Sequence, residues 1–282
     1  MIIRERPVEI DQETLVMGIL NCTPDSFYPG SRIPTVEIAI QRARDMAVCG
    51  VDIIDVGGES TRPGSKQVSV QEEIEKVCPV IETIRGELDT IISVDTTKAP
   101  VAEQALRVGA DMVNDISALK GDEDMKYLVA GKKVPIVLMH MRGTPETMQQ
   151  KPHYHDTLGE IEAELQDSVR LAVEAGISRE LIIVDPGIGF GKRPEDNLLI
   201  IRHLNRLKKM GFPLLIGLSR KSFLGFVLDL PVEKRLIGTV AANTIAILNG
   251  ADIVRVHDYL EAVQMVRVIR AIQKVEPLST TG

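Results

Sequence analysis

Eight short apolar runs rich in β-branched residues recur along the chain, and each has the length of one strand. Between them apolar residues return every three or four positions, as at Val36, Ile40 and Ala43, which is the spacing of a helix that buries one face. The predicted strands lie at 15–20, 51–56, 91–95, 112–116, 134–139, 181–185, 213–218 and 252–256. The predicted helices lie at 36–48, 70–85, 98–107, 122–130, 156–175, 195–209, 235–248 and 259–274. The pattern therefore predicts strands and helices in alternation.

A glycine follows the helical pattern at three places, Gly50, Gly109 and Gly250, and each precedes an apolar strand. Glycine just past a helix end adopts the positive φ that other residues avoid, so one helix–glycine–strand unit repeats. Strands that are apolar throughout and alternate with helices are typical of a parallel sheet covered on both faces. Eight such units predict an α/β fold, a (β/α)8 TIM barrel. The alternative, an open doubly wound sheet, is disfavoured because no G-x-G-x-x-G turn follows the first strand.

No linker, low-complexity tract or charge block divides the chain, so we expect a single domain over 1–282. In that domain 1–13 would cap the barrel bottom and 277–282 would form a flexible tail. The chain becomes charged at Arg4, which predicts no secretory signal peptide. The three cysteines form no C-x-x-C pair. Free thiols of this kind are typical of a reducing compartment, so we expect a cytoplasmic protein.

Charge and aromatic content limit the classes of partner. The chain has 33 Lys+Arg and 40 Asp+Glu, which gives a net charge of −7 and no overall positive field for nucleic acid or an anionic membrane. Aromatic residues make up 3% and there is no Trp, so stacking surfaces for single-stranded nucleic acid are also disfavoured. We therefore expect small-molecule ligands and neither nucleic acid nor a membrane.

Hydrogen-bonding side chains follow all eight predicted strands, at the end where barrel enzymes place their chemistry. Any one of them could simply begin a turn, but eight together indicate a site. They are Asn21, Asp55, Asp95, Asn114, His140, Asp185, the run Ser219 to Ser222, and Arg255 with His257. Asp95, Asn114 and Asp185 supply acceptors that suit a planar heterocycle rich in N–H donors. Asp115 would point to the opposite face of its strand, and we expect it to be structural.

The cationic residues gather after the last two strands, where barrels commonly bind phosphate. They are Arg220, Lys221, Arg255 and His257, with Arg62 approaching from its loop. Asp258 and Glu261 have the D-x-x-E spacing of a capped helix start, and a helix N-terminus attracts anions. This end of the barrel is therefore predicted to hold a phosphate-bearing anion.

Three common motifs do not fit the residues. The segment G-x-G-x-G-K at 187–192 is no Walker A motif, because Pro186 and Arg193 occupy required Gly and Ser/Thr positions, and it is no dinucleotide fingerprint. There is no G-x-S-x-G, and we identify no Ser–His or Cys–His pair for nucleophilic catalysis. His153 and His155 lack a third metal ligand, which favours a solvated loop.

Six stretches together resemble the dihydropteroate synthase family of folate biosynthesis, in order and spacing, from the first strand to the last. They are N-x-T-P-D-S-F at 21–27, D-x-G-G-E-S-T-R-P-G at 55–64, S-x-D-T at 93–96, D-P-G-x-G-F-G-K at 185–192, S-R-K-S-F at 219–223 and R-V-H-D at 255–258. The resemblance implies a transferase that joins 6-hydroxymethyl-7,8-dihydropterin diphosphate to 4-aminobenzoate. The products would be 7,8-dihydropteroate and diphosphate. It also implies a barrel fold, Mg2+, a homodimer and a family that is a target of sulfonamides, which mimic aminobenzoate.

The resemblance also implies a role for each matching position. Pterin would contact Asp95, Asn114, Ile116, Met139, Asp185, Lys221 and Arg255. Diphosphate would contact Asn21, Thr61, Arg62, Arg255 and His257, and Asn21 would also hold Mg2+. Aminobenzoate would contact Pro63, Phe190, Lys221 and Ser222. The catalytic set would be Asp95, Asp185, Lys221, Arg255 and His257.

Two loops, 22–32 with Asp25 and Phe27, and 60–67, would close over the substrates. The first loop departs from the family pattern, because Tyr28 to Arg32 replace the usual Ser-Asp-Gly-Gly. Pro29 fixes φ and removes a donor, so we expect a stiffer loop.

We predict a dissociative, SN1-like step, since the conjugated ring delocalises a developing cation and the neutral arylamine needs no strong base. Three alternatives remain. A methyltetrahydrofolate-binding methyltransferase domain would need the acceptors but not the cationic cluster. A non-catalytic pterin-binding barrel predicts a broken motif, yet every polar position is filled. A sugar-phosphate aldolase would need a lysine inside a strand, and none of the eight predicted strands has one.

Overall fold

The computed structural model describes most of the chain. The described residues are 1–3, 6–8, 10, 13–22, 35–60, 68–144, 147–150 and 152–275. The predicted tail at 277–282 lies outside them.

Eight parallel strands form a nearly closed barrel, which confirms the predicted (β/α)8 class. They are β3 (Leu15–Asn21), β4 (Ile53–Gly57), β5 (Ile91–Asp95), β6 (Met112–Asp115), β7 (Ile136–Met139), β8 (Ile182–Asp185), β9 (Leu215–Ile216) and β10 (Ile253–Val256). Their order in the sheet is β8-β7-β6-β5-β4-β3-β10-β9, and a parallel bridge from Val184 to Leu214 brings β8 beside the β9 segment.

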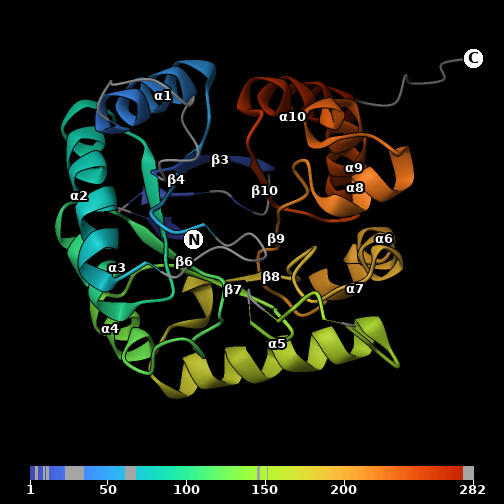
Figure 1. The fold of residues 1–282 in the computed structure, drawn as a ribbon, viewed down its shortest axis with the longest axis horizontal. Coiled ribbons are helices and arrows are strands. Elements are labelled where there is room, and N and C mark those ends of the chain that lie inside the picture. Colours follow the sequence, from blue (N-terminus) through green and yellow to red (C-terminus); the bar gives the residue numbers. More distant parts are fainter. Residues whose placement is uncertain are drawn as a thin grey trace, which may run out of the picture.

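Helices cover the outside of the strands (Figure 1). They are α1 (Thr35–Cys49), α2 (Val70–Glu87), α3 (Ala99–Arg107), α4 (Met125–Lys132), α5 (Thr157–Glu174), α6 (Pro194–Arg202), α7 (Leu204–Lys208), α8 (Ser222–Leu228), α9 (Leu236–Leu248) and α10 (Tyr259–Gln273). Gly50, Gly109 and Gly250 have φ of 89°, 119° and 104°, which confirms the predicted helix ends. No helix among the described residues is long and apolar enough to cross a membrane.

Three local predictions differ from the structure. The predicted helix at 195–209 is two helices, because His203 has φ −114° and ψ 28° and leaves the helical conformation between α6 and α7. Helix α8 is absent from the prediction. It is only seven residues long, too short for a helical period to stand out in the sequence. The small antiparallel pair of β1 (Ile2–Ile3) with β2 (Arg6–Pro7) is also absent from the prediction.

The barrel interior changes from apolar to polar along several of the strands. Alternate residues of a strand point inward, and the lower interior is filled by an apolar cluster of Ile10, Leu15, Met17, Ile53, Met112, Val137, Ile183, Leu215 and Ile253. Ile10 comes from the N-terminal segment, which therefore helps to fill the bottom of the barrel. Two residues further along, the inward positions are polar, as at Asp55, Asn114 and Asp185. The strand pattern thus places a polar cup on a solid apolar floor.

Candidate active site

Arg255 on β10 joins two carboxylates across the cup. Its Nε donates to Asp55 Oδ2 at 2.6 Å, and its Nη2 donates to Asp95 Oδ2 at 2.5 Å. Asn114 on β6 donates from Nδ2 to the same Asp55 oxygen at 3.1 Å. The ends of four strands thus bring together Asp55, Asp95, Asn114 and Arg255, as predicted for the carboxyl ends of barrel strands.

Asp55 is a site residue to which the sequence argument assigned no role. Its side chain is fully buried on β4, and it accepts from both Arg255 and Asn114. Among the described residues, its second oxygen, Oδ1, is buried with no hydrogen-bond partner. The available signal was its position at an inward-facing strand end, two residues after the buried Ile53. An unsatisfied buried carboxylate oxygen is an open acceptor in the cup.

The two carboxylates compete for the Arg255 charge. Burial raises the pKa of Asp95 above its ordinary value, the Arg255 guanidinium opposes this, and the Asp55 charge adds to the rise. Because Nε and Nη2 of Arg255 are already engaged, its charge is largely balanced inside the cup. Arg255 therefore offers less free positive charge to an anion than the sequence implies.

Lys221 lies near Arg255 in the cup. A Cβ added at Gly217 would lie 3.7 Å from Lys221 Nζ and 3.9 Å from Arg255 Cβ. The two side chains therefore both lie close to Gly217, which has no side chain of its own. Lys221 Nζ donates to the carbonyl of Ile188 and lies 4.8 Å from the centre of the Phe190 ring. Burial lowers the pKa of Lys221 to about 8, and the charge of Asp185 opposes the shift.

Asp185, at the end of β8, is buried in the same cup. Its Oδ1 accepts from the Gly187 backbone N–H at 2.7 Å, which fixes the carboxylate. Burial raises the pKa of Asp185, and Lys221 is the main charge that lowers it. Asp185 thus supplies an acceptor of fixed orientation close to the Lys221 cation.

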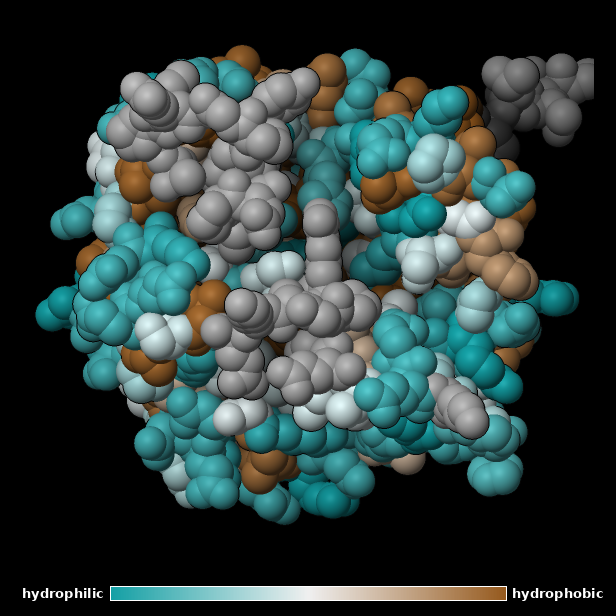
Figure 2. All heavy atoms as spheres, viewed as in Figure 1, coloured by the Kyte–Doolittle hydropathy of each residue, from teal (hydrophilic) through white to brown (hydrophobic). Residues whose placement is uncertain are grey.

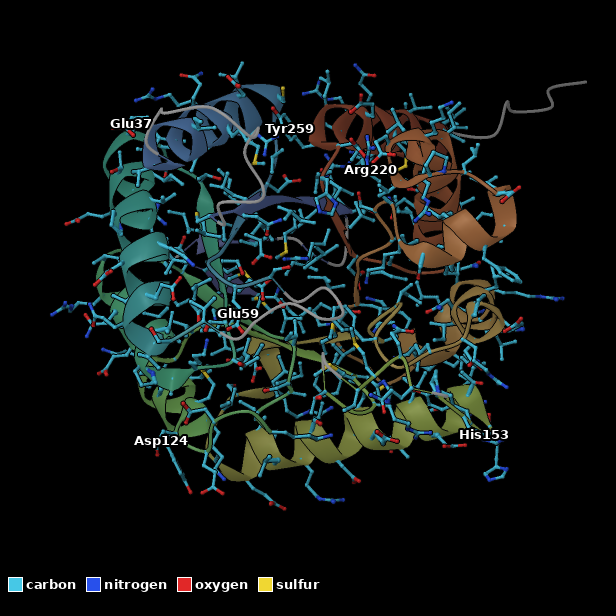
Figure 3. The ribbon with its side chains drawn as sticks, in the orientation of Figure 1. Glu37, Glu59, Asp124, His153, Arg220 and Tyr259 are labelled. Carbon is cyan, nitrogen blue, oxygen red and sulfur yellow. The ribbon has the colours of Figure 1, made fainter. Side chains whose placement is uncertain are left out.

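The cationic cluster is smaller than the sequence indicates. Arg220 donates from Nε and Nη2 to both carboxylate oxygens of Asp258, at 2.8 and 2.7 Å, and from Nη1 to the carbonyls of Val232 and Glu233. Figure 3 shows Arg220 among α8, α9 and α10. The predicted capping role of Asp258 is wrong, because it sits at the N-cap of α10 but makes no cap bond. A bidentate Arg–carboxylate pair is stronger than a single cap bond.

His257 and Ser219 are in contact, although the sequence gives no sign that these two side chains meet. His257 Nδ1 lies 3.0 Å from Ser219 Oγ, and the His257 backbone N–H donates to the same oxygen at 3.2 Å. The Ser219 side chain is buried, while His257 is exposed. The serine therefore orients the imidazole and is not itself presented to a ligand.

The side chains of Asn21 and Asp95 both lie close to Gly57, which has no side chain. A Cβ on Gly57 would lie 3.8 Å from Asn21 Oδ1 and 3.7 Å from Asp95 Oδ2. Within the described part of the chain, no group of three or more His, Cys, Asp or Glu side chains could hold a metal ion. Mg2+ commonly takes one or two protein oxygens and completes its shell with substrate phosphates and water. Asn21 fits a site of that kind.

The similarity to known proteins covers nearly the whole chain. A family model described as pterin binding enzyme matches residues 17–257. The dihydropteroate synthase of Synechocystis is 50% identical over 262 residues, which cover 93% of this chain and 91% of that protein.

Two solved structures extend the comparison to the fold. Dihydropteroate synthase from Xanthomonas albilineans with 4-aminobenzoic acid has a TM-score of 0.91 and 41% identity, covering 96% of this chain and 97% of that one. The Yersinia pestis synthase in a sulfonamide drug complex has a TM-score of 0.92 and 40% identity, covering 98% and 99%.

The chain belongs to the dihydropteroate synthase family of pterin-binding enzymes.

The described structure places some of the remaining residues that the family resemblance singles out. Ile116 and Met139 are buried at the ends of β6 and β7, and Ser222 is exposed at the start of α8. Asp115 accepts from Ser117 and Leu119 in the following turn, which confirms its structural role. The other residues lie outside the described ranges: Asp25, Phe27, Thr61, Arg62 and Pro63.

Proposed function

We propose that this chain joins 6-hydroxymethyl-7,8-dihydropterin diphosphate to 4-aminobenzoate and releases diphosphate, the dihydropteroate synthase reaction. The observation that carries the proposal is the buried cup, in which Asp95, Asn114 and Asp185 stand beside Lys221 and Arg255. Carboxylate and amide acceptors suit the ring and amino N–H groups of a pterin. A related synthase from Xanthomonas albilineans was solved in complex with 7,8-dihydropteroate.

In this proposal the pterin contacts Arg255, with Ile116 and Met139 flanking the ring. Asp185 and Asn114 accept from its N–H groups, and Lys221 donates to its carbonyl. The open Oδ1 of Asp55 is available to the same ligand or to a water molecule. Aminobenzoate would then lie beside Phe190, Lys221, Ser222 and Pro63. Sulfonamides would compete for that place, as the drug complex of the Yersinia pestis relative suggests.

The leaving diphosphate would be held by His257, Thr61, Arg62 and Asn21. We propose that Ser219 keeps the His257 ring directed at the departing anion, so that stabilisation is in place before the bond breaks. Mg2+ bound with Asn21 would supply further positive charge to the leaving group. The neutral arylamine needs no general base, so positioning is the main contribution of the chain to a dissociative step.

We also propose that the chain forms a homodimer. Large apolar side chains are exposed on α8, α9 and the start of α10: Phe226, Val227, Ile237, Ile245, Leu248 and Leu260. Figure 2 shows apolar residues over these C-terminal helices, at the upper right of the view. Exposed apolar surface of this kind is typical of protein–protein contact.

Formation of pteroate tests the proposed reaction. The purified chain is incubated with both substrates and Mg2+, and the products are separated, then identified and quantified by mass spectrometry. We expect 7,8-dihydropteroate in amounts equal to the diphosphate released. Binding of the pterin without any pteroate would instead favour a non-catalytic barrel or a methyltransferase domain.

The protonation of Lys221 gives a pH dependence. We expect the Kd of the pterin substrate to rise about tenfold between pH 7 and pH 9, because only the ammonium form donates fully and its pKa is about 8. The pKa lies below the ordinary value of a lysine, so the proton is lost within this range. Calorimetry at the two pH values measures the change. The Lys221→Met variant should bind the pterin substrate weakly and with the same Kd at both pH values. A wild-type Kd that does not change with pH would contradict the proposed role of Lys221.

A further inference from the structure

Lys192 is a buried cation that the proposed reaction does not use. It follows the glycine-rich segment 186–191 and is only 3% exposed. Its Nζ lies 2.9 Å from His140 Nδ1 and donates to the carbonyls of Phe190, at 3.0 Å, and His140, at 3.4 Å. Within the described residues these three partners are all neutral acceptors. A buried amine without a hydrogen-bonded carboxylate is costly, and an apolar side chain would fill the space at lower cost.

The partners of Lys192 are themselves held in one arrangement. Burial lowers the pKa of His140 to about 4, so the ring is neutral and Nδ1 can accept. The ring proton is then on Nε2, which lies 3.1 Å from Glu164 Oε2 on α5. Glu164 also pairs with Arg142. Burial lowers the pKa of Lys192 to about 7, and the amine keeps N–H donors in either protonation state.

The glycine-rich segment depends on such outside contacts for its shape. Gly187, Gly189 and Gly191 all have positive φ, between 65° and 83°. A Cβ at Gly187 or Gly191 would overlap the backbone carbonyl of His140 or Arg142, so the segment is pressed against the chain that follows β7. Glycines add no side chains that could hold the loop, and Phe190 stands among them.

Phe190 connects these anchoring contacts to the substrate cup. Its ring faces Lys221 Nζ at 4.8 Å, and its carbonyl accepts from Lys192 at 3.0 Å. The backbone of Phe190 is thus tied through Lys192 to His140, and through His140 to α5. A shift of that carbonyl would move the ring relative to Lys221.

We propose that Lys192 is a positioning residue that sets the place of the Phe190 ring and so the affinity for the aromatic amine substrate. Lys192 touches neither substrate, and it acts through the Phe190 backbone. The proposal rests on the proposed synthase activity. Asp95, Asn114 and Asp185 make no hydrogen bond to Lys192, and the Lys192 charge acts on Asp185 only through space, so the predicted effect falls mainly on the aromatic amine.

Lys192→Met separates this role from general stability. We expect the KM for 4-aminobenzoate to rise about tenfold, with the KM for the pterin diphosphate and kcat within about twofold of the wild type. Lys192→Gln keeps an N–H donor and should give an intermediate KM. The matched control is Tyr154→Phe, which removes a buried hydrogen bond of 2.8 Å to the neighbouring carbonyl of Gly191. That variant should lose thermal stability without the selective rise in KM.

Wild-type turnover is measured first in the same assay. An inactive, folded wild type contradicts the proposed function. Turnover with equal rises in both KM values, no rise in either, or the same selective rise in Tyr154→Phe contradicts the role of Lys192 alone. If Lys192→Met does not fold, Lys192→Gln decides by the same ratio of the two KM values.

Discussion

Arg255→Met is expected to lower the free energy of unfolding by about 3–5 kcal/mol, because it leaves two buried carboxylates without their shared cation. Asp55 is fully buried, the Asp95 side chain is 11% exposed, and both accept from Arg255. Urea unfolding at neutral pH measures the loss. The same variant should abolish turnover, since it also removes the cation beside Lys221.

Arg220→Met is the matched control for Arg255. Arg220 also makes a two-oxygen ion pair, with Asp258, but this pair lies nearer the surface and outside the cup. We expect a smaller loss of stability from that variant. The deficit of Arg255→Met should shrink as the pH falls from 7, because protonation neutralises the Asp95 carboxyl group, whose folded pKa lies above the unfolded value. A deficit that is independent of pH, or equal to that of Arg220→Met, would contradict the paired-carboxylate account.

Asp185→Asn is expected to cost about 1.5–3 kcal/mol of binding free energy for the pterin substrate. The loss comes from replacing a charged acceptor by an amide that faces the N–H groups of the ring. The substituted side chain keeps an oxygen that can accept from the Gly187 backbone N–H, so the backbone should stay in place. Calorimetric titration with the pterin substrate gives the difference directly.

Asp115→Asn supplies the comparison for Asp185. Asp115 is also a buried carboxylate at a strand end, but it faces away from the cup and holds the turn through Ser117 and Leu119. We expect that variant to lose stability and to keep its pterin affinity. Unchanged pterin affinity in Asp185→Asn would remove Asp185 from the pterin site.

The fold was predictable because its signals are local. Apolar runs, helical spacing and the positive φ of Gly50, Gly109 and Gly250 each depend on a few neighbouring residues. The polar cup was predictable for a related reason. Once parallel strands form a barrel, their carboxyl ends meet, and the period of two decides which residues point inward.

Pairings across the barrel were not predictable in the same way. Arg255 and Asp55 are 200 positions apart, and Arg220 and Asp258 are 38 apart. Whether such side chains meet depends on strand register and on competing partners, which no local pattern carries. Asp258 shows the consequence, because its spacing predicts a helix cap while Arg220 takes both its oxygens. The Ser219–His257 contact likewise joins the ends of two different strands.

The role of Lys192 was only partly predictable from the sequence. Its motif at 187–192 resembles a phosphate loop closely enough to be considered and differs enough to be set aside. The structure shows that the glycines permit close approach to His140 and Arg142, and that the lysine faces inward. The same residues thus shape a wall of the cup.

The release of diphosphate from the dihydropterin diphosphate tests the central claim most directly. It is measured with and without 4-aminobenzoate and with and without Mg2+, using Asp185→Asn as a variant that keeps the fold. The account predicts release that requires the enzyme, Mg2+ and aminobenzoate, matches the pteroate formed and falls in the variant. Pterin binding with no release under any of these conditions would contradict it.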